Sequence, residues 1–304
     1  MSIQVVVPTA ELAEAVGPVT GAEFTVWNGD GDALTHVDLW VPDYSTHPSV
    51  IDRVQAFGSV GAVQLQTAGY DGVPERMPAG VSLHSAVGVH DDATAEHAVG
   101  MTLAVLRGIP ESVRNADTGT WVRMPGRQSL ADARVMILGY GSIGRAVAER
   151  LVPMKAHVTG VATRPRPDDV VGQVRGFDEL DALLPKQDVV IVLVPHNAAT
   201  DKLVDASFLA KMADGALLVN VARGGVADTD AILAEAGRLR FALDVTDPEP
   251  LPDGHPLFNA PGVLITPHVA GGTTAMLPRM AAVIRAQVTR LVAGEPLAHV
   301  VHPV

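Results

Sequence analysis

The chain of 304 residues contains no cysteine, which excludes disulfides, thiolate metal sites and a cysteine nucleophile. Such an absence is typical of proteins in a reducing compartment. None of the 11 histidines stands in H-E-x-x-H or another recognisable metal-binding spacing. We therefore expect no metal site.

Basic residues are few and scattered along the chain. There are 22 lysines and arginines against 34 acids, which gives a formal net charge of -12. The nearest approach to a basic cluster is the pair Arg164 and Arg166. Because this charge repels polyphosphate backbones and anionic membranes, we expect neither a nucleic acid nor a membrane as a partner.

Long apolar runs are also missing. The start, MSIQVVVPTA, has no basic segment and too short an apolar stretch for a signal peptide or a membrane span. Together with the missing cysteines, this start predicts a cytoplasmic protein.

What the chain does contain is two series of short β-branched runs. Segments that could be helices separate most of these runs, and the runs barely alternate between apolar and polar residues, which is typical of parallel sheets covered on both faces. The pattern predicts an α/β protein with two doubly wound parallel-sheet domains. The runs are IQVVVP, EFTVW, VDLWVP, VGAVQLQT and VSLHSA, then ARVMILG, HVTGVA, DVVIVLV, GALLVNVA, RFALDV and GVLITP.

Two long helical patterns set the domain boundaries. The stretch DDATAEHAVGMTLAVLRG reads as one helix connecting the domains, and TAMLPRMAAVIRAQVTRLVAG returns the chain towards the first domain. We therefore predict a Rossmann cofactor domain, residues 93–274, inserted into a flavodoxin-like substrate domain formed by residues 1–92 and 275–304.

The segment RVMILGYGSIGRAVAERL carries a dinucleotide-binding pattern. Gly139, Gly141 and Gly144 fit G-x-G-x-x-G where a predicted strand ends and a helix begins. The three glycines allow a tight turn, close approach of a pyrophosphate and close packing of helix on strand. The pyrophosphate then lies on N–H groups at the positive end of the helix.

The next strand, HVTGVA, ends without an acid at its tip. An acid there usually holds the ribose 2′-hydroxyl of NAD, whereas here Thr163, Arg164 and Arg166 follow. A guanidinium suits a 2′-phosphate, so NADP(H) is favoured and NAD(H) stays possible. In the alternative, the arginines are solvated loop residues and Asp168 or Asp169 folds back to the ribose.

Charged side chains follow three of the later strands. Arg223 follows LLVNVA, the acids of LDVTDPEPLP follow RFAL, and His268 follows LITP. Each alone has a structural explanation, but open parallel sheets bind their ligands at the carboxyl ends of the strands. These positions are therefore candidates for catalysis.

Together these features resemble the D-isomer-specific 2-hydroxyacid dehydrogenases, and most closely their glyoxylate/hydroxypyruvate reductase branch. The resemblance spans most of the chain and is carried by TAGYDGV (67–73), TAEHAVGMTLAVLR (94–107), LGYGSIGRAVA, VPHNAATDKLVD, VNVARGG, ALDVTDPEPLPDGHPLF and TPHVAGGT.

The resemblance implies reduction of a small 2-keto acid, such as glyoxylate or hydroxypyruvate, to the D-2-hydroxy acid, and the reverse. His268 would deliver a proton to the carbonyl oxygen as charge develops there. Glu249 would pair with the imidazolium and orient it, and Arg223 would bind the substrate carboxylate. Asp244 would contact the nicotinamide, and Asp247 would be a solvated loop acid.

The resemblance also implies the binding residues. Backbone N–H groups of a substrate loop containing Ala68, Gly69 and Tyr70 would hold the other side of the carboxylate, with Arg223 and His268 completing the substrate site between the domains. A homodimer would form through the connecting helix and the TGTWVRMPG arm. The implied cofactor contacts are Gly139, Tyr140, Gly141, Ser142, Ile143, Gly144, Thr163, Arg164, Arg166, Val194, Pro195, Thr200, Val221, Ala222, Asp244, His268 and Gly271.

Several alternatives remain open. Phosphite dehydrogenases keep the same three catalytic residue types, and branched or aromatic 2-keto acids are other substrates of this family. Glutamine replaces Glu249 in the formate dehydrogenases, which disfavours formate. A chain that stops at Val304 is not expected to be one of the long phosphoglycerate dehydrogenases. A nicotinamide-sensing corepressor shares the same residues but should turn over 2-keto acids poorly.

Overall fold

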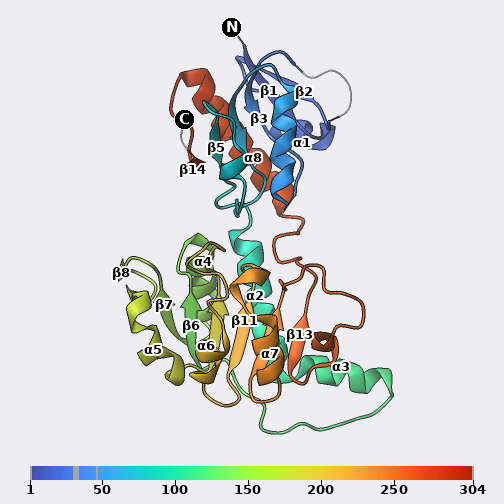
Figure 1. Ribbon diagram of the computed structural model, residues 1–304, viewed down its shortest axis with the longest axis vertical. Coiled ribbons are helices and arrows are strands. Elements are labelled where there is room, and N and C mark those ends of the chain that lie inside the picture. Colours follow the sequence, from blue (N-terminus) through green and yellow to red (C-terminus); the bar gives the residue numbers. More distant parts are fainter. Residues whose placement is uncertain (1, 30–33, 46, 303–304) are drawn as a thin grey trace. The chain divides into compact units, whose positions relative to one another are not determined.

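The computed structural model describes residues 2–29, 34–45 and 47–302. The chain divides into two compact units, one formed by Met1–His90 and Gly272–Val304 and the other by Asp91–Gly271. Figure 1 shows the elements of both. Each unit is described by itself.

In the first unit, the described residues form a six-stranded sheet in the order β14-β5-β4-β3-β1-β2. Strands β1 to β5 run parallel, which the apolar runs predicted, but β14 pairs antiparallel with β5. The sequence analysis did not predict β14, because three residues are too few for a periodic pattern. The strands are β1 (Ile3–Val7), β2 (Ala22–Val26), β3 (Val37–Trp40), β4 (Val60–Gln64), β5 (Ser82–His84) and β14 (Val300–His302).

Helices α1 (Ala10–Val16) and α8 (Met276–Ala293) pack together in this unit (Figure 1). Their buried side chains, among them Leu12, Ile284 and Val288, form one core with strands β1 and β3. Residues Pro48–Ala56, where the sequence could form an α-helix, form the 3-10 helix η1 instead, with a proline in its first turn. A second short 3-10 helix, η2, spans Pro74–Arg76.

The second unit contains a parallel sheet of six strands in the order β13-β12-β11-β10-β6-β7, and all of its residues, 91–271, are described. The order reverses direction between β6 and β10, as in a doubly wound dinucleotide-binding fold. The strands are β6 (Arg134–Leu138), β7 (His157–Val161), β10 (Val189–Val192), β11 (Leu217–Asn220), β12 (Arg240–Leu243) and β13 (Val263–Ile265), with a separate hairpin of β8 (Arg166–Asp168) and β9 (Gly172–Val174).

The long helix α2 (Asp91–Arg107) belongs to the core of the second unit. It packs against α4 (Ser142–Leu151), and its residues Ala95 and Leu106 are buried in the same cluster as strands β6, β10 and β11. The other helices are α3 (Ile109–Asp117), α5 (Leu180–Leu183), α6 (Ala206–Ala210), α7 (Thr229–Glu235) and the 3-10 turns η3 (Phe177–Glu179), η4 (Leu184–Lys186), η5 (Gly224–Val226) and η6 (Pro256–Asn259).

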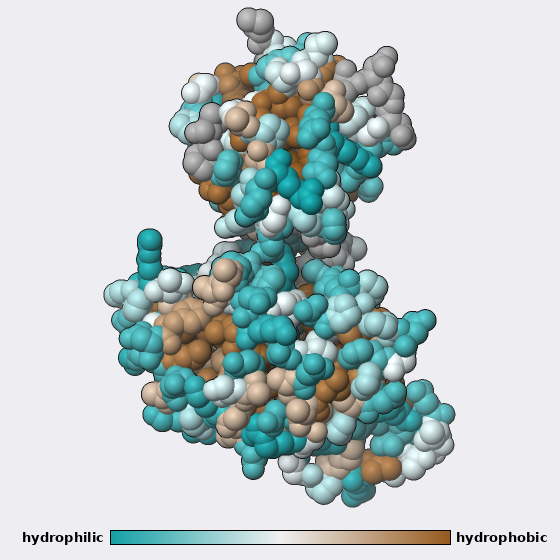
Figure 2. All heavy atoms as spheres, in the orientation of Figure 1, coloured by the Kyte–Doolittle hydropathy of each residue, from teal (hydrophilic) through white to brown (hydrophobic). Residues whose placement is uncertain are grey.

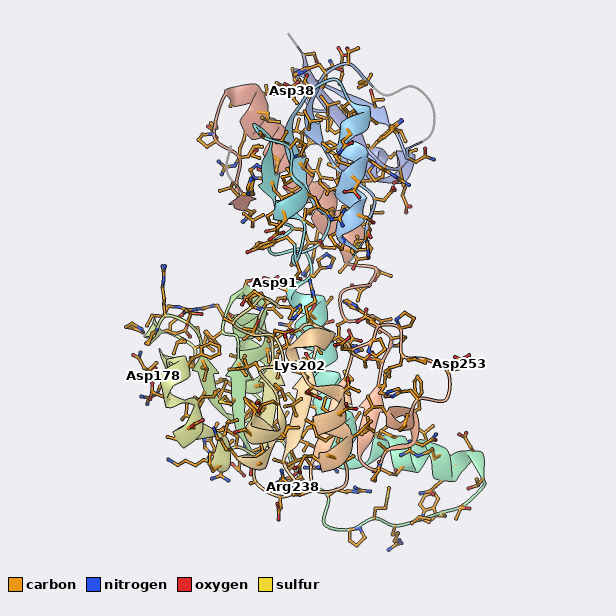
Figure 3. All side chains as sticks on the ribbon, in the orientation of Figure 1. Asp38, Asp91, Asp178, Lys202, Arg238 and Asp253 are labelled. Atoms are coloured by element: carbon orange, nitrogen blue, oxygen red, sulfur yellow. The ribbon has the colours of Figure 1, made fainter. Side chains whose placement is uncertain are left out.

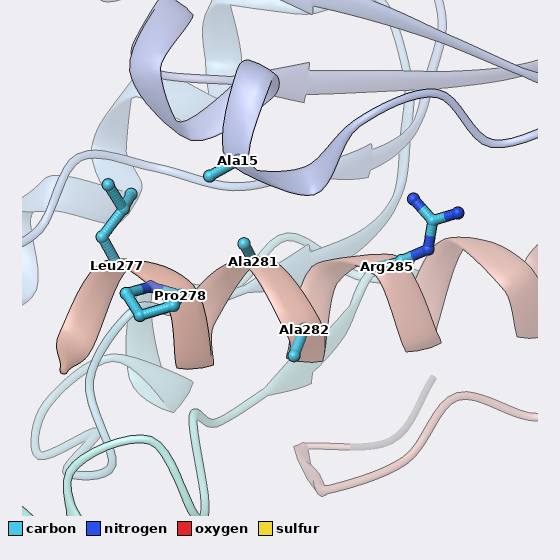
Figure 4. Close-up of a pocket in the computed structure, with 6 residues that line it drawn as sticks. All are labelled: Ala15, Leu277, Pro278, Ala281, Ala282 and Arg285. Atoms are coloured by element: carbon cyan, nitrogen blue, oxygen red, sulfur yellow. The ribbon is translucent and has the colours of Figure 1, made fainter.

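The visible face of each unit is largely hydrophilic (teal in Figure 2), with smaller apolar areas in brown. In the described part of the chain, no helix combines the length and apolarity needed to cross a membrane. A shallow pocket of about 440 Å³ in the first unit lies between α1 and α8 (Figure 4). Small and apolar side chains with one arginine line it, namely Ala15, Leu277, Pro278, Ala281, Ala282 and Arg285.

Candidate active site

The candidate residues of the second unit follow strands that all end at one edge of its sheet. Because β6, β10, β11, β12 and β13 are parallel, the loops after them emerge on the same side. Residues such as Arg238, which precedes β12, lie at the opposite edge (Figure 3). Arg238 donates to the carbonyl oxygens of Leu209 and Met212 and so stabilises loops there.

The glycine-rich loop after β6 has the shape that a pyrophosphate needs. Gly139 has a φ of 108°, and a Cβ atom there would come within 2.5 Å of the Leu193 backbone. A Cβ atom on Gly144 would lie 2.6 Å from the Gly139 carbonyl oxygen, whereas one on Gly141 would meet nothing within 4 Å. The open space therefore lies at Gly141.

Helix α4 begins directly after this space. No side chain caps its first turn, which contains Ser142, Ile143 and Gly144, so the amino-terminal N–H groups are not satisfied by a capping residue. The helix dipole adds partial positive charge at the same point. This loop and helix fit the diphosphate of a dinucleotide.

The predicted 2′-phosphate residues follow β7 and are exposed. Thr163, Arg164 and Arg166 lie at the surface, and no described residue bonds the Arg164 side chain. The Arg166 guanidinium donates to the Tyr140 carbonyl oxygen at 2.7 Å and to the Arg164 carbonyl oxygen at 3.3 Å. Arg164 is thus the more available of the two guanidinium groups.

The predicted nicotinamide-contacting acid, Asp244, follows β12 and is 2% exposed. Its Oδ1 atom accepts hydrogen bonds from Thr266 Oγ1 at 2.6 Å and Val269 N at 3.0 Å, and its Oδ2 atom from Ala270 N at 3.0 Å. His97 Nε2 on helix α2 lies 3.2 Å from Oδ1 and 2.9 Å from Thr266 Oγ1. Asp244 therefore fixes the loop that carries His268.

The charge of Asp244 is strongly favoured in this setting. Burial alone raises the pKa of its carboxyl, but hydrogen bonds from His97, Thr266 and the two backbone N–H groups outweigh it and lower the pKa to about 2. The carboxylate is therefore ionised throughout the physiological range.

His268 and Glu249 form the central pair of the site. His268 Nδ1 and Glu249 Oε1 are 2.5 Å apart, and no described residue bonds His268 Nε2. His268 has a φ of 53°, and its backbone N–H donates to the Asp244 carbonyl oxygen at 2.8 Å. Glu249 stands between Pro248 and Pro250, whose rings fix φ and restrict the loop. The exposed Asp247 makes no side-chain bond that would place it in this pair.

Arg223 is half-buried after β11, and its loop packs on the backbone that leads to Glu249. Its Nη1 atom donates to the Ala222 carbonyl oxygen at 2.7 Å. A Cβ atom on the next residue, Gly224, would overlap the Thr246 carbonyl oxygen at 1.8 Å, so only glycine allows the two loops to touch. The arginine loop and the glutamate loop are thereby held together.

The remaining predicted cofactor residues lie in the loops of the same edge. Val194, Val221 and Ala222 are buried and Pro195 is exposed, while Gly271 is half-buried. Thr200 Oγ1 donates to the Pro195 carbonyl oxygen at 2.6 Å and closes the loop after β10. Apart from Thr200, these residues have apolar side chains or none, so their polar groups available to a cofactor are those of the backbone.

In the first unit, the predicted substrate loop follows β4. Ala68 and Gly69 are half-buried, and Tyr70 is 40% exposed. Thr67 Oγ1 donates to the Gly69 carbonyl oxygen at 2.7 Å, which gives the loop a defined shape.

Residues 99–270 match a family model described as "D-isomer specific 2-hydroxyacid dehydrogenase, NAD binding domain". The chain belongs to this family. The family and the fold predicted from the sequence motifs are confirmed, and this 2-hydroxyacid dehydrogenase is an NAD(P)-dependent oxidoreductase.

Relatives of this dehydrogenase include a glyoxylate reductase of Thermofilum pendens, 33% identical over 254 residues that cover 80% of this chain and 75% of that protein. The NADPH-dependent glyoxylate/hydroxypyruvate reductase of Sinorhizobium meliloti, solved with NADP and sulfate, superposes with a TM-score of 0.81 at 26% identity, covering 99% of this chain and 98% of its own. A D-isomer specific 2-hydroxyacid dehydrogenase of Xanthobacter autotrophicus, solved with NADPH and MES, has a TM-score of 0.81 at 27% identity and the same coverage.

The sequence analysis of this dehydrogenase missed the partners of two predicted residues, Asp244 and Tyr140. The buried Asp244 is contacted by His97 of helix α2, which also contacts Thr266. Arg145 and Asp168 form a cluster with Tyr140. Neither set is local in sequence, so only the packing of helices on the sheet reveals them.

Proposed function

We propose that this dehydrogenase reduces a small 2-keto acid, with glyoxylate and hydroxypyruvate as the leading candidates, to the D-2-hydroxy acid and catalyses the reverse reaction. The observation that carries the proposal is the contact between His268 Nδ1 and Glu249 Oε1 at the carboxyl edge of a dinucleotide-binding sheet. Relatives named as glyoxylate or hydroxypyruvate reductases support the substrate class.

His268 is the proton donor in this proposal. With Nδ1 held by Glu249, the ring presents Nε2 to the carbonyl oxygen, where negative charge develops during reduction. The Glu249 carboxylate stabilises the imidazolium before it gives up its proton and keeps the ring oriented. The reduced nicotinamide, when bound, supplies the hydride.

Arg223 binds the substrate carboxylate. Its guanidinium offers parallel N–H donors that match the two oxygens, and the packing of Gly224 on the Thr246 backbone fixes the loop from which it extends. In the first unit, backbone N–H groups of Ala68 and Gly69, in the loop after β4, are the further candidates for substrate binding. Asp244 orders the His268 loop and would accept a hydrogen bond from the nicotinamide carboxamide.

NADPH is the preferred cofactor in this proposal. The strand β7 ends without an acid, the following Arg164 is exposed, and two similar proteins were solved with NADP or NADPH. A guanidinium at this place pairs with a 2′-phosphate, whereas a free ribose 2′-hydroxyl needs an acceptor.

A homodimer completes the proposal. Among the described residues, no side chain of helix α3 is fully buried. The apolar side chains of α3 and the following arm are 49%, 55%, 91% and 49% exposed at Ile109, Val113, Trp121 and Val122. Such apolar side chains are expected to be covered by a second copy.

A panel of 2-keto acids, followed by loss of reduced-nicotinamide absorbance with NADPH and NADH side by side, tests the function. Turnover of glyoxylate or hydroxypyruvate with NADPH preferred supports it. Faster turnover of branched or aromatic 2-keto acids corrects the substrate. Activity with phosphite alone, or tight cofactor binding without any turnover, overturns it.

A further inference from the structure

The hairpin β8–β9 follows the exposed arginines and is fastened to the glycine-rich loop through one acid. Asp168, whose side chain is 8% exposed, closes the hairpin turn by accepting hydrogen bonds on Oδ1 from Val170 N at 3.0 Å and Val171 N at 3.1 Å. The same oxygen accepts the Tyr140 hydroxyl at 2.9 Å, and Oδ2 accepts Arg145 Nη1 at 3.2 Å. Four donors from three segments therefore meet on this carboxylate.

Tyr140 fastens the hairpin at a second point. Its ring is buried against Gly160 of β7, where an added Cβ atom would come within 2.6 Å of Cδ2. Its carbonyl oxygen accepts Arg166 Nη2 at 2.7 Å, and the Arg166 guanidinium carbon lies 5.8 Å from the centre of the Tyr140 ring. The residue between the first two glycines of the motif thus holds both Arg166 and Asp168.

The protonation states match this arrangement. Burial raises the pKa of Tyr140 strongly, and the Asp168 carboxylate raises it further, so the phenol keeps its proton and donates it. Burial also raises the pKa of Asp168, but the N–H of Val171 and the Tyr140 hydroxyl outweigh this and lower it, so the acid stays ionised.

The arrangement removes the acids that a ribose 2′-hydroxyl could use. Rotating Asp168 towards a ribose would leave a buried hydroxyl and two turn N–H groups without an acceptor, which is costly. Asp169, the next acid, is held by Arg145 at 2.6 and 3.1 Å. The exposed side chain beside the end of β7 is then the cation Arg164.

We propose that Tyr140, through its contacts with Asp168 and Arg166, is the residue that sets the preference for the 2′-phosphorylated cofactor. This inference rests on the NADPH preference in the proposed function and extends it: specificity depends on sequestering an acid as well as on presenting a guanidinium. Tyr140 is a positioning residue here, since it acts through Asp168 and Arg166.

The test measures the affinity of the full chain for NADPH and for NADH, in the absence of substrate, by the fluorescence of each reduced cofactor. In Tyr140→Phe, which loses one hydroxyl, NADPH should bind roughly tenfold more weakly, while NADH binding should stay equal or improve because Asp168 loses one of its four donors. Glu149→Gln is the matched control: it removes the negative charge from another partner of Arg145, on helix α4, but leaves the hairpin contacts intact. Its ratio of NADPH to NADH affinity should equal that of the wild type.

Asp168→Ala tests the same contact from the other side and keeps the test valid if Tyr140→Phe does not fold. It should weaken NADPH binding because the hairpin loses its anchor on Tyr140 and Arg145, but it should not improve NADH binding because no acid is left at this position. The double variant should bind NADPH no more weakly than either single variant because the pair acts as one unit. An unchanged affinity ratio in the folded variants, with wild type preferring NADPH, overturns the role of Tyr140 alone. A wild type that prefers NADH overturns the NADPH proposal as well, whatever its activity on 2-keto acids.

Discussion

The Nδ1 atom of His268 and the Oε1 atom of Glu249 are 2.5 Å apart, although the two residues are 19 positions apart in sequence. The contact requires the loop after β12, which carries Glu249, and the loop after β13, which carries His268, to keep a fixed position relative to each other. Asp244 provides this, since it binds the backbone of residues 268–270 through its carbonyl and carboxylate oxygens. The proposed proton donor His268 is therefore positioned by the buried Asp244 as well as by Glu249.

Replacement of His268 by alanine should lower kcat for 2-keto acid reduction by roughly 10²- to 10⁴-fold, because the proton donor is lost. NADPH affinity should change little, since the role belongs to the transition state. Steady-state rates and fluorescence titration measure the two effects. His157→Ala, at the exposed start of β7, is the control and should keep full activity. Near-wild-type turnover of His268→Ala would rule out the mechanism.

Replacement of Arg223 by lysine should reduce kcat/KM for the keto acid by roughly 10- to 100-fold, with most of the change in KM. An ammonium group retains the charge but cannot reproduce the two parallel donors of the guanidinium. Arg175→Lys, an exposed arginine paired with Glu179, serves as the control. A wild-type KM in Arg223→Lys would show that the carboxylate binds elsewhere.

The stability of the protein should depend on Asp244 at acid pH. Its pKa is about 2 in the folded chain against an ordinary value of 3.8, so folding favours the carboxylate. The resulting stabilisation, roughly 2 kcal/mol, is complete above about pH 4 and is lost as the pH falls towards 2. Urea unfolding of wild type and Asp244→Asn from pH 7 to 3 should show their difference in unfolding free energy shrinking. Asp253→Asn, in the loop after β12 (Figure 3), should show no such trend; a pH-independent difference for Asp244→Asn would contradict the assignment.

The exposed apolar side chains of helix α3 and the arm after it should mediate dimerisation. Wild type is expected at twice the chain mass of 31.7 kDa by light scattering. Val113→Asp combined with Trp121→Glu should give a monomer, because charges would be buried against apolar side chains. Val152→Asp, at another exposed valine, should stay dimeric. A monomeric wild type would refute the proposed dimer.

The sequence predicted most of the fold because its strands are apolar runs that need no distant partner to be recognised. All eleven predicted runs contain the parallel strands of the two six-stranded sheets. The glycine motif was equally readable, since its three glycines stand at a fixed spacing between an apolar run and a helical pattern. The edge strand β14 and the hairpin β8–β9 were missed because each strand has only three residues.

The partners of the site residues were harder to predict. Asp244 was interpreted as a cofactor contact, but most of its hydrogen bonds are to its own chain, from Thr266 to Ala270 and from His97. Tyr140 was identified by its place in the glycine motif, and nothing local connects it with Asp168, which lies 28 residues away. Such pairings arise from tertiary packing, which residue spacing does not encode.

Because the first unit is formed by two separate segments of the chain, the two units cannot complete their folding in the order of the sequence. Helix α8 contributes Met280, Ile284 and Val288 to the core of the first unit, and Gln287 bonds the buried Gln64 at 2.8 Å. The ribosome makes these residues after the whole of Asp91–Gly271. The second unit can therefore complete its core while the first still exposes apolar surface, which is the condition under which incompletely folded chains aggregate.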